Sequence, residues 1–123
     1  MKQHDYARWY IGGHSLGGAM AAGYAAAHSE RFSGVYMLAA YPTKPLGENM
    51  RAMIIYGSED GVLNRKNQEK ANLYMPDGST TYVIEGGNHA QFGNYGIQDG
   101  DGIASVTSEE QQRRTAELIL QNR

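Results

Sequence analysis

Three residues far apart in the sequence carry side chains that could together cleave an acyl bond: Ser15, Asp60 and His89. A serine hydroxyl alone is a weak nucleophile and needs an adjacent base. A neutral histidine can take the serine proton and return it to a leaving group. A carboxylate can orient the imidazole and stabilise its charged form. These residue types predict nucleophilic acyl-transfer chemistry if the fold brings them together.

Ser15 is flanked by Gly13 and Gly17 in a G-x-S-x-G pattern, between a short apolar strand and an Ala-rich stretch predicted to be helical. So tight a turn requires a strained backbone at the serine, and we expect a Cβ at position 13 or 17 to collide with a neighbouring strand or helix. The backbone N–H of Leu16, at the start of the helix, is then a candidate oxyanion donor.

A glycine-rich turn between a strand and a helix could instead bind phosphate or nothing. The dinucleotide pattern G-x-G-x-x-G is not met, because Ser15 stands where its second glycine would follow Gly13. A Walker loop is not met either, because no lysine follows Gly17. These contexts favour Ser15 as a nucleophile.

Apolar runs and turn residues predict short strands that alternate with helices. This alternation implies an α/β fold with a parallel sheet and right-handed crossovers. In the last helix we expect Ala116, Ile119 and Leu120 to form the buried stripe, and Glu110 to pair with Arg114. The predicted strands cover residues 9–11, 34–41, 50–56 and 80–84, and the predicted helices cover 16–28, 64–74 and 107 or 108 to the C-terminus.

The ends of the predicted strands carry the polar residues. Ligand sites of parallel sheets form at the carboxyl ends of the strands, and Ser15, Asp60 and His89 each follow such an end. Glu59 competes with Asp60 for the role of the acid, but Asp-Gly suits the turn better. His14 is expected to be a packing residue or a wall of the site. Two aromatic residues, Tyr41 and Phe92, are possible pocket residues that could equally belong to the core.

Three segments resemble the motifs of the α/β-hydrolase superfamily: residues 12–18 (Gly-Gly-His-Ser-Leu-Gly-Gly), 56–61 (Tyr-Gly-Ser-Glu-Asp-Gly) and 86–96 (Gly-Gly-Asn-His-Ala-Gln-Phe-Gly-Asn-Tyr-Gly). They are closest to small bacterial hydrolases related to dienelactone hydrolases. The resemblance covers nearly the whole chain from Trp9 onward, and it implies Ser15 as nucleophile, Asp60 as acid and His89 as base. It also implies a truncated fold of about four parallel strands in one domain, residues 1–123. The N-terminal half of the family's sheet, which supplies a second oxyanion donor, is missing.

Composition narrows the class of protein further. The 123 residues suffice for one small domain. The net charge is −2, from 11 basic and 13 acidic residues, and no Lys/Arg block exceeds a pair, which argues against nucleic-acid and membrane-surface partners. Cysteine is absent, so no disulfide or thiolate metal site is expected, and the proposed chemistry needs no metal or cofactor. Asp and Gly at positions 99–102 read as turn residues.

The remaining expectations concern location and partners. The first six residues lack the apolar core of a signal peptide, which favours a cytoplasmic protein as the sequence is written. The strand at 9–11 would lie at an edge of the sheet, which predicts a homodimer or higher homo-oligomer that covers it. The sequence therefore favours a serine carboxylesterase acting on small acyl esters. The alternative is a weak or inactive hydrolase remnant that serves as an assembly subunit.

Overall fold

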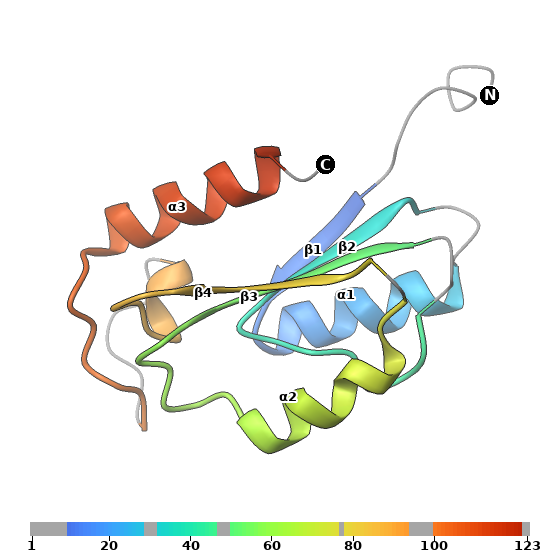
Figure 1. Cartoon of the computed structure of the whole chain (residues 1–123), viewed down its shortest axis with the longest axis horizontal. Coiled ribbons are helices and arrows are strands. Elements are labelled where there is room, and N and C mark those ends of the chain that lie inside the picture. The colour runs from blue at the N-terminus through green and yellow to red at the C-terminus, as the bar shows by residue number, and fades with distance from the viewer. Residues whose placement is uncertain (1–9, 29–31, 47–49, 77, 94–99, 122–123) are drawn as a thin grey trace.

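The computed structural model describes residues 10–28, 32–46, 50–76, 78–93 and 100–121. In this part of the chain, four strands form one sheet in the order β1-β2-β3-β4, and every neighbouring pair is parallel (Figure 1). The expected α/β class is confirmed. The strands are β1 (Tyr10–His14), β2 (Gly34–Leu38), β3 (Arg51–Gly57) and β4 (Thr80–Ile84).

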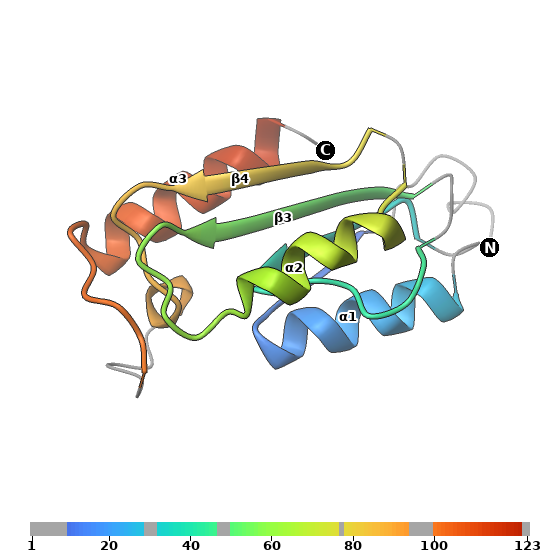
Figure 2. The same ribbon diagram turned by 60° about the horizontal axis from the view of Figure 1, so that its bottom comes forward.

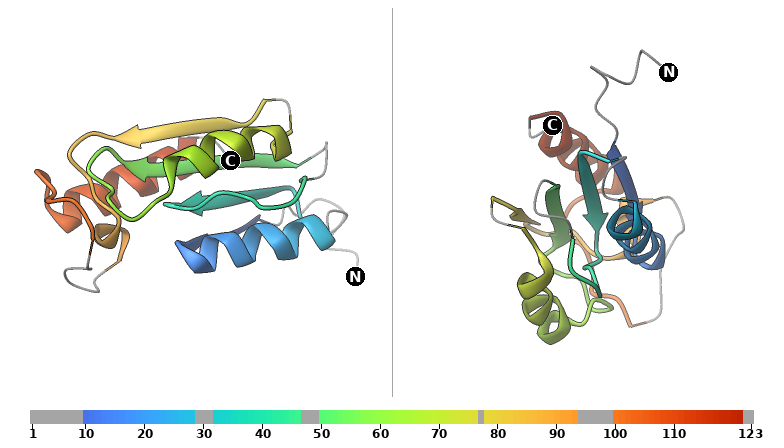
Figure 3. Two further views of the ribbon diagram at one scale, coloured as in Figure 1. Left: turned by 90° about the horizontal axis from the view of Figure 1, so that it is seen from below. Right: turned by 90° about the vertical axis from the view of Figure 1, so that its right-hand side faces the viewer.

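Helices cover both faces of the sheet. Two of them, α1 (Leu16–Ala27) and α2 (Arg65–Ala71), lie on one face, and α3 (Ser108–Gln121) lies on the other (Figures 1 and 3). Short 3₁₀ helices follow α2 (η2, Asn72–Tyr74) and β4 (η3, Ala90–Phe92). The sheet is therefore the middle of three layers, as its apolar strands require.

The core beneath α1 depends on small residues. The buried face of α1 consists of Gly18 and alanines, and its alanines pack against strand residues such as Met37 and Ile54. A Cβ at Gly18 would lie 2.7 Å from the Ala40 Cβ, so glycine is needed where the helix approaches the chain that follows β2. On the opposite face, Leu118 and Ile119 of α3 pack against a second cluster, formed by Tyr36, Met53, Ile55 and Ile84.

Two predicted elements are longer than the observed ones. The run predicted at 34–41 leaves the sheet after Leu38, because Ala39 takes a left-handed backbone with a φ of 53°. The Ala39 N–H still donates to the Ile55 carbonyl of β3 at 2.7 Å, and the chain turns away from the sheet after this bond. The helix predicted at 64–74 begins after Asn64, whose side chain caps it, and its last turn is η2. Trp9, predicted as the start of the first strand, lies outside the described residues.

The buried stripe of α3 differs from the prediction. Leu120 and Ala116 are exposed, whereas Gln111 and Thr115 are buried. Thr115 donates its hydroxyl to the Gln111 carbonyl at 2.8 Å. Hydrophobicity alone places the stripe wrongly because the inward polar side chains have partners that offset the cost of burying them. Ile119 packs against the sheet as expected.

Charged pairs on the exposed side of α3 follow the predicted spacing. Arg114 donates Nε–H to Glu110 at 2.7 Å, as expected for positions i and i+4. The hydroxyl oxygen of Thr107 accepts the Glu110 N–H at 3.1 Å and so caps the helix. The paired arginines lower the pKa of Glu110 to about 2.

The outer edge of the sheet on the β1 side is apolar. Within the described sheet, β1 has a neighbour on one side, β2. The adjacent helix α1 contains no charged residue, and it exposes Leu16 (73%) and Met20 (67%).

None of the described helices combines the length and the apolar character that crossing a membrane requires.

Candidate active site

The three residues singled out from the sequence meet at the carboxyl ends of the strands. Figure 2 shows the ends of β3 and β4 pointing the same way, with η3 and the loop before α3 gathered at that end. His89 Nε2 lies 2.8 Å from Ser15 Oγ, and His89 Nδ1 lies 2.8 Å from Asp60 Oδ2. A continuous hydrogen-bonded chain thus runs from a hydroxyl through an imidazole to a carboxylate. We call it the Ser15–His89–Asp60 array.

The turn between β1 and α1 projects the Ser15 hydroxyl. Ser15 has a φ of 58° and a ψ of −124°, a strained backbone that persists where the surroundings impose it. Its N–H donates to the Leu38 carbonyl at 2.8 Å, which holds the turn against β2. A Cβ at Gly13 would lie 2.5 Å from the Gly17 backbone, as expected. The same expectation for Gly17 is wrong, because a Cβ there meets nothing within 4 Å; Gly18 is the second crowded glycine.

The loop after β3 fixes the orientation of Asp60. Its Oδ1 accepts the backbone N–H groups of Val62 and Leu63, both at 2.8 Å, which leaves Oδ2 directed at His89. Asp60 is buried. Glu59, the other candidate for the acid, is exposed and accepts a hydrogen bond from Ser58 Oγ at 3.3 Å. In the described structure Asp60 therefore occupies the position beside the imidazole.

His89 is bonded at each of its four polar groups and is 2% exposed. Besides the two ring contacts, its N–H donates to Asp101 Oδ1 at 3.0 Å, and its carbonyl accepts from His14 Nε2 at 2.7 Å. The bond to Asp60 assigns a proton to Nδ1, so Nε2 is free to accept the Ser15 hydroxyl proton. This arrangement suits a general base.

His14 and Phe92 lie beside the array, and Phe92 also packs against the second core cluster. The His14 ring centroid lies 5.0 Å from that of His89 and 5.6 Å from that of Phe92. Burial lowers the pKa of His14, and this effect outweighs the opposing hydrogen bond to the His89 carbonyl. Tyr41, the other possible pocket residue, packs against the core beneath α1. Leu16 begins α1, where the first N–H groups of a helix have no intrahelical partner.

Sequence reasoning missed Asp101, which it treated as a turn residue. The Asp101 carboxylate accepts four backbone N–H groups of the described loops, those of Gly61 (3.2 Å), His89 (3.0 Å), Ala90 (2.9 Å) and Gly102 (2.9 Å). These bonds lower the pKa of Asp101 even though burial acts to raise it. Asp99, the other acidic residue of that segment, lies outside the described residues.

A buried amide network, also missed, ties the His89 loop to α3. Gln111 Oε1 accepts the Asn88 N–H at 3.0 Å, and Gln111 Nε2 donates to the Asn88 carbonyl at 2.7 Å. Gln91 donates from Nε2 to the same Oε1 at 3.1 Å. The signal in the sequence was the spacing, because Gln111 and Thr115 lie one turn apart on the face that continues to Ile119.

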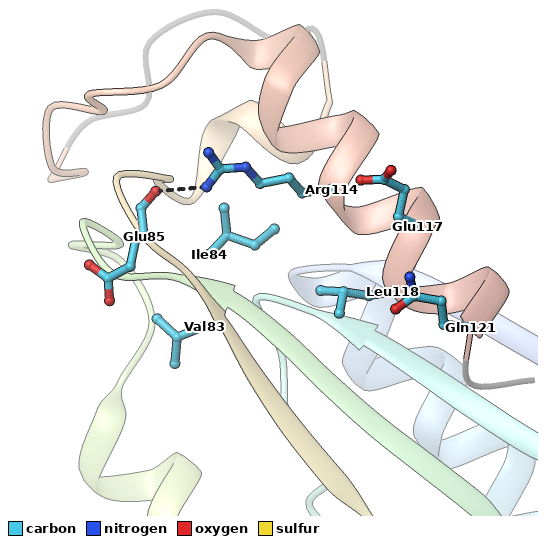
Figure 4. A pocket seen from close by; sticks show the side chains of 7 residues that line it. All are labelled: Val83, Ile84, Glu85, Arg114, Glu117, Leu118 and Gln121. Carbon is cyan, nitrogen blue, oxygen red and sulfur yellow. Dashed lines mark hydrogen bonds between the residues drawn. The ribbon is translucent and has the colours of Figure 1, made fainter.

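A separate hollow lies between β4 and α3, and the array residues are not among those that line it. Its volume is about 300 Å³. Figure 4 shows Arg114 reaching across its rim to the Glu85 carbonyl, with Ile84 and Leu118 nearby. The lining residues are Val83, Ile84, Glu85, Arg114, Glu117, Leu118 and Gln121.

The parallel sheet presents a serine at a strand–helix turn, and Asp60 and His89 follow later strands. This arrangement is typical of alpha/beta hydrolases. The chain belongs to the alpha/beta hydrolase family, whose model matches residues 1–113. This result confirms the resemblance inferred from the three motifs. A comparison with curated proteins finds no match.

Among solved structures, the chain is similar to a predicted CIB-like hydrolase from Thermoplasma acidophilum. The TM-score is 0.62 at 21% sequence identity, and the match covers 96% of this chain and 53% of that one. The chain therefore spans about half the length of its structural relative. At this identity the likeness supports the fold.

Proposed function

We propose that this chain is a serine hydrolase of the carboxylesterase type, which cleaves small acyl esters through an acyl-enzyme on Ser15. The observation that carries the proposal is the Ser15–His89–Asp60 array, with both hydrogen bonds at 2.8 Å. Family membership supports it, because nucleophile, acid and base follow the chain order Ser, Asp, His of alpha/beta hydrolases.

In the proposed reaction, Ser15 Oγ attacks the acyl carbon while His89 Nε2 takes its proton. The tetrahedral intermediate collapses, the ester C–O bond breaks, and the imidazolium returns the proton to the departing alcohol. Water then attacks the acyl-enzyme, His89 removes its proton, and collapse releases the acid and restores the Ser15 hydroxyl. Asp60 holds the imidazole in its orientation and stabilises the imidazolium.

Charge on the acyl oxygen needs hydrogen-bond donors. We assign one to the Leu16 N–H, at the start of α1, where the helix dipole favours negative charge. Loss of one such donor costs about 10²–10³ in kcat in a serine protease, so we expect the Leu16 N–H to contribute strongly to turnover.

A second candidate function is an assembly subunit with little or no catalysis. The apolar exterior of α1 beside the edge strand β1 favours it, because such surfaces tend to pair with another chain. The simplest partner is a second copy of this chain, as the sequence led us to expect.

Covalent labelling tests the proposal. A fluorophosphonate should label the wild-type chain at neutral pH and leave Ser15→Ala unlabelled, and hydrolysis of p-nitrophenyl acetate should follow the same pattern. Absence of labelling in a folded wild-type chain would refute the esterase and favour the assembly subunit. Equal labelling of Ser15→Ala would place the nucleophile elsewhere.

A further inference from the structure

The backbone of His89 is held by two side chains from other parts of the chain. Asp101 accepts its N–H at 3.0 Å, and His14 donates to its carbonyl at 2.7 Å. Asp101 also accepts the N–H of Gly61, the residue after Asp60, at 3.2 Å. One carboxylate thus contacts both the loop that carries the acid and the loop that carries the base.

We propose that Asp101 is a positioning residue that sets the placement of the His89 imidazole relative to Asp60. The inference rests on the proposed hydrolase function, and it names a residue that acts through the array without touching the substrate. A carboxylate suits this task because its two oxygens can accept about four hydrogen bonds, the number that Asp101 receives from the described loops.

Close packing supports the proposal. The segment of Asp101 lies directly against the Asp60 loop: a Cβ at Gly61 would be 2.3 Å from the Gly100 carbonyl oxygen, and one at Gly102 would overlap the Glu59 carbonyl. The two backbones approach so closely that only glycine fits. Asp101 is therefore held in a fixed position, and its hydrogen bond with the His89 N–H fixes the position of the His89 backbone.

Other contacts hold the same loops at different points. The Glu59 N–H donates to the Gly87 carbonyl at 2.8 Å, close to the strand ends, and Gln111 ties Asn88 to α3. These bonds remain when Asp101 is replaced, so we expect the loops to stay folded. What changes is the freedom of His89 itself, and a misplacement of about 1 Å costs about 10²-fold in rate.

The test compares Asp101→Ala with Thr107→Ala. The alanine removes both carboxylate oxygens and with them the acceptors of the His89 and Gly61 N–H groups. Thr107→Ala removes the cap of α3 and weakens the fold without touching the array. We expect kcat to fall about 10- to 100-fold in Asp101→Ala, with KM within about twofold of wild type. Thr107→Ala should keep the wild-type kcat.

A second readout does not depend on turnover. The ¹⁵N chemical shifts of the His89 imidazole report the tautomer and the hydrogen bond at each ring nitrogen, and their signals are assigned by their loss in His89→Gln. Asp101→Ala should move both shifts, and Thr107→Ala should leave them unchanged. Unmoved shifts in Asp101→Ala would overturn the proposal whatever happens to kcat. If the wild type neither hydrolyses esters nor reacts with fluorophosphonate, the proposed function fails, and these shifts alone decide the role of Asp101.

Discussion

Replacing Asp60 by asparagine should disable the base without disturbing the fold. Asp60 Oδ1 accepts the N–H groups of Val62 and Leu63 at 2.8 Å, and Oδ2 faces His89 Nδ1 at 2.8 Å. In Asp60→Asn, the amide oxygen should keep the place of Oδ1, because the opposite orientation would point NH₂ hydrogens at two N–H groups. The amide nitrogen then faces His89 and donates to it.

The size of the effect follows from these bonds. Turning the amide would leave two backbone N–H groups unsatisfied, at about 1–3 kcal/mol each, which holds the asparagine in the disabling orientation. His89 Nδ1 must then accept, so the proton moves to Nε2, which can no longer take the proton of Ser15. The corresponding substitution in serine proteases lowers kcat about 10⁴-fold, which at 1.36 kcal/mol per factor of ten is about 5.4 kcal/mol in the barrier.

The assay is hydrolysis of p-nitrophenyl acetate at neutral pH by purified wild type, Asp60→Asn and Glu59→Gln. Glu59 is the adjacent exposed carboxylate, so its variant loses the same charge outside the array. We expect kcat of Asp60→Asn to fall about 10⁴-fold and that of Glu59→Gln to stay near wild type. A loss of less than about tenfold in Asp60→Asn, or an equal loss in both variants, would refute the reasoning.

Further predictions concern strain, packing, pH and association. Ser15→Gly should exceed Ser15→Ala in free energy of unfolding by about 1 kcal/mol, measured by urea denaturation, because glycine relieves the strained φ; equal values would contradict the strain. Gly13→Ala should lower stability by about 1–3 kcal/mol through overlap with the backbone, whereas Gly17→Ala, with open space on α1, should raise it by about 0.5–1 kcal/mol in the same assay. Burial lowers the pKa of His14 in the folded state, so the unfolded chain binds more protons once the pH falls below about 6.5. The free energy of unfolding should therefore fall as the pH is lowered from about 6.5 to the folded-state pKa, and urea denaturation of His14→Gln should show a shallower fall. Identical pH dependence in wild type and variant would show that His14 does not cause the fall. Sedimentation should give the wild type a mass above the 13.5 kDa of one chain, and Met20→Glu should shift it toward a monomer; a compact wild-type monomer at micromolar concentration would end the oligomer proposal.

The positions of Ser15, Asp60 and His89 could be predicted because backbone geometry constrains them. A parallel sheet brings the carboxyl ends of its strands to one edge, and each of these residues follows a strand whose apolar run is visible in the sequence. Gly13 was predictable for the same reason, since the turn brings its backbone against the start of the helix. The error at Gly17 came from treating both glycines of the motif as equally crowded.

The role of Asp101 and the partners of Gln111 could not be predicted, because these contacts join distant segments and involve the backbone. Asp101 reaches Gly61, which precedes it by 40 residues, and an Asp-Gly pair in a sequence reads as a turn whether or not its carboxylate binds another loop. Gln111 breaks the apolar pattern of α3, and only the folded loop around Asn88 explains why an amide is buried there.

Because Gln111 of α3 holds the His89 loop, the order in which the chain is synthesised has a consequence. Synthesis delivers Ser15 first and Gln111, which anchors the loop of His89, almost 100 residues later. A nascent chain can therefore present the Ser15 hydroxyl well before Gln111 anchors the His89 loop. Because Gln111 belongs to α3, an interruption of translation between Asp101 and this helix yields a product that keeps Ser15 and His89 but lacks the Gln111 contacts with the His89 loop.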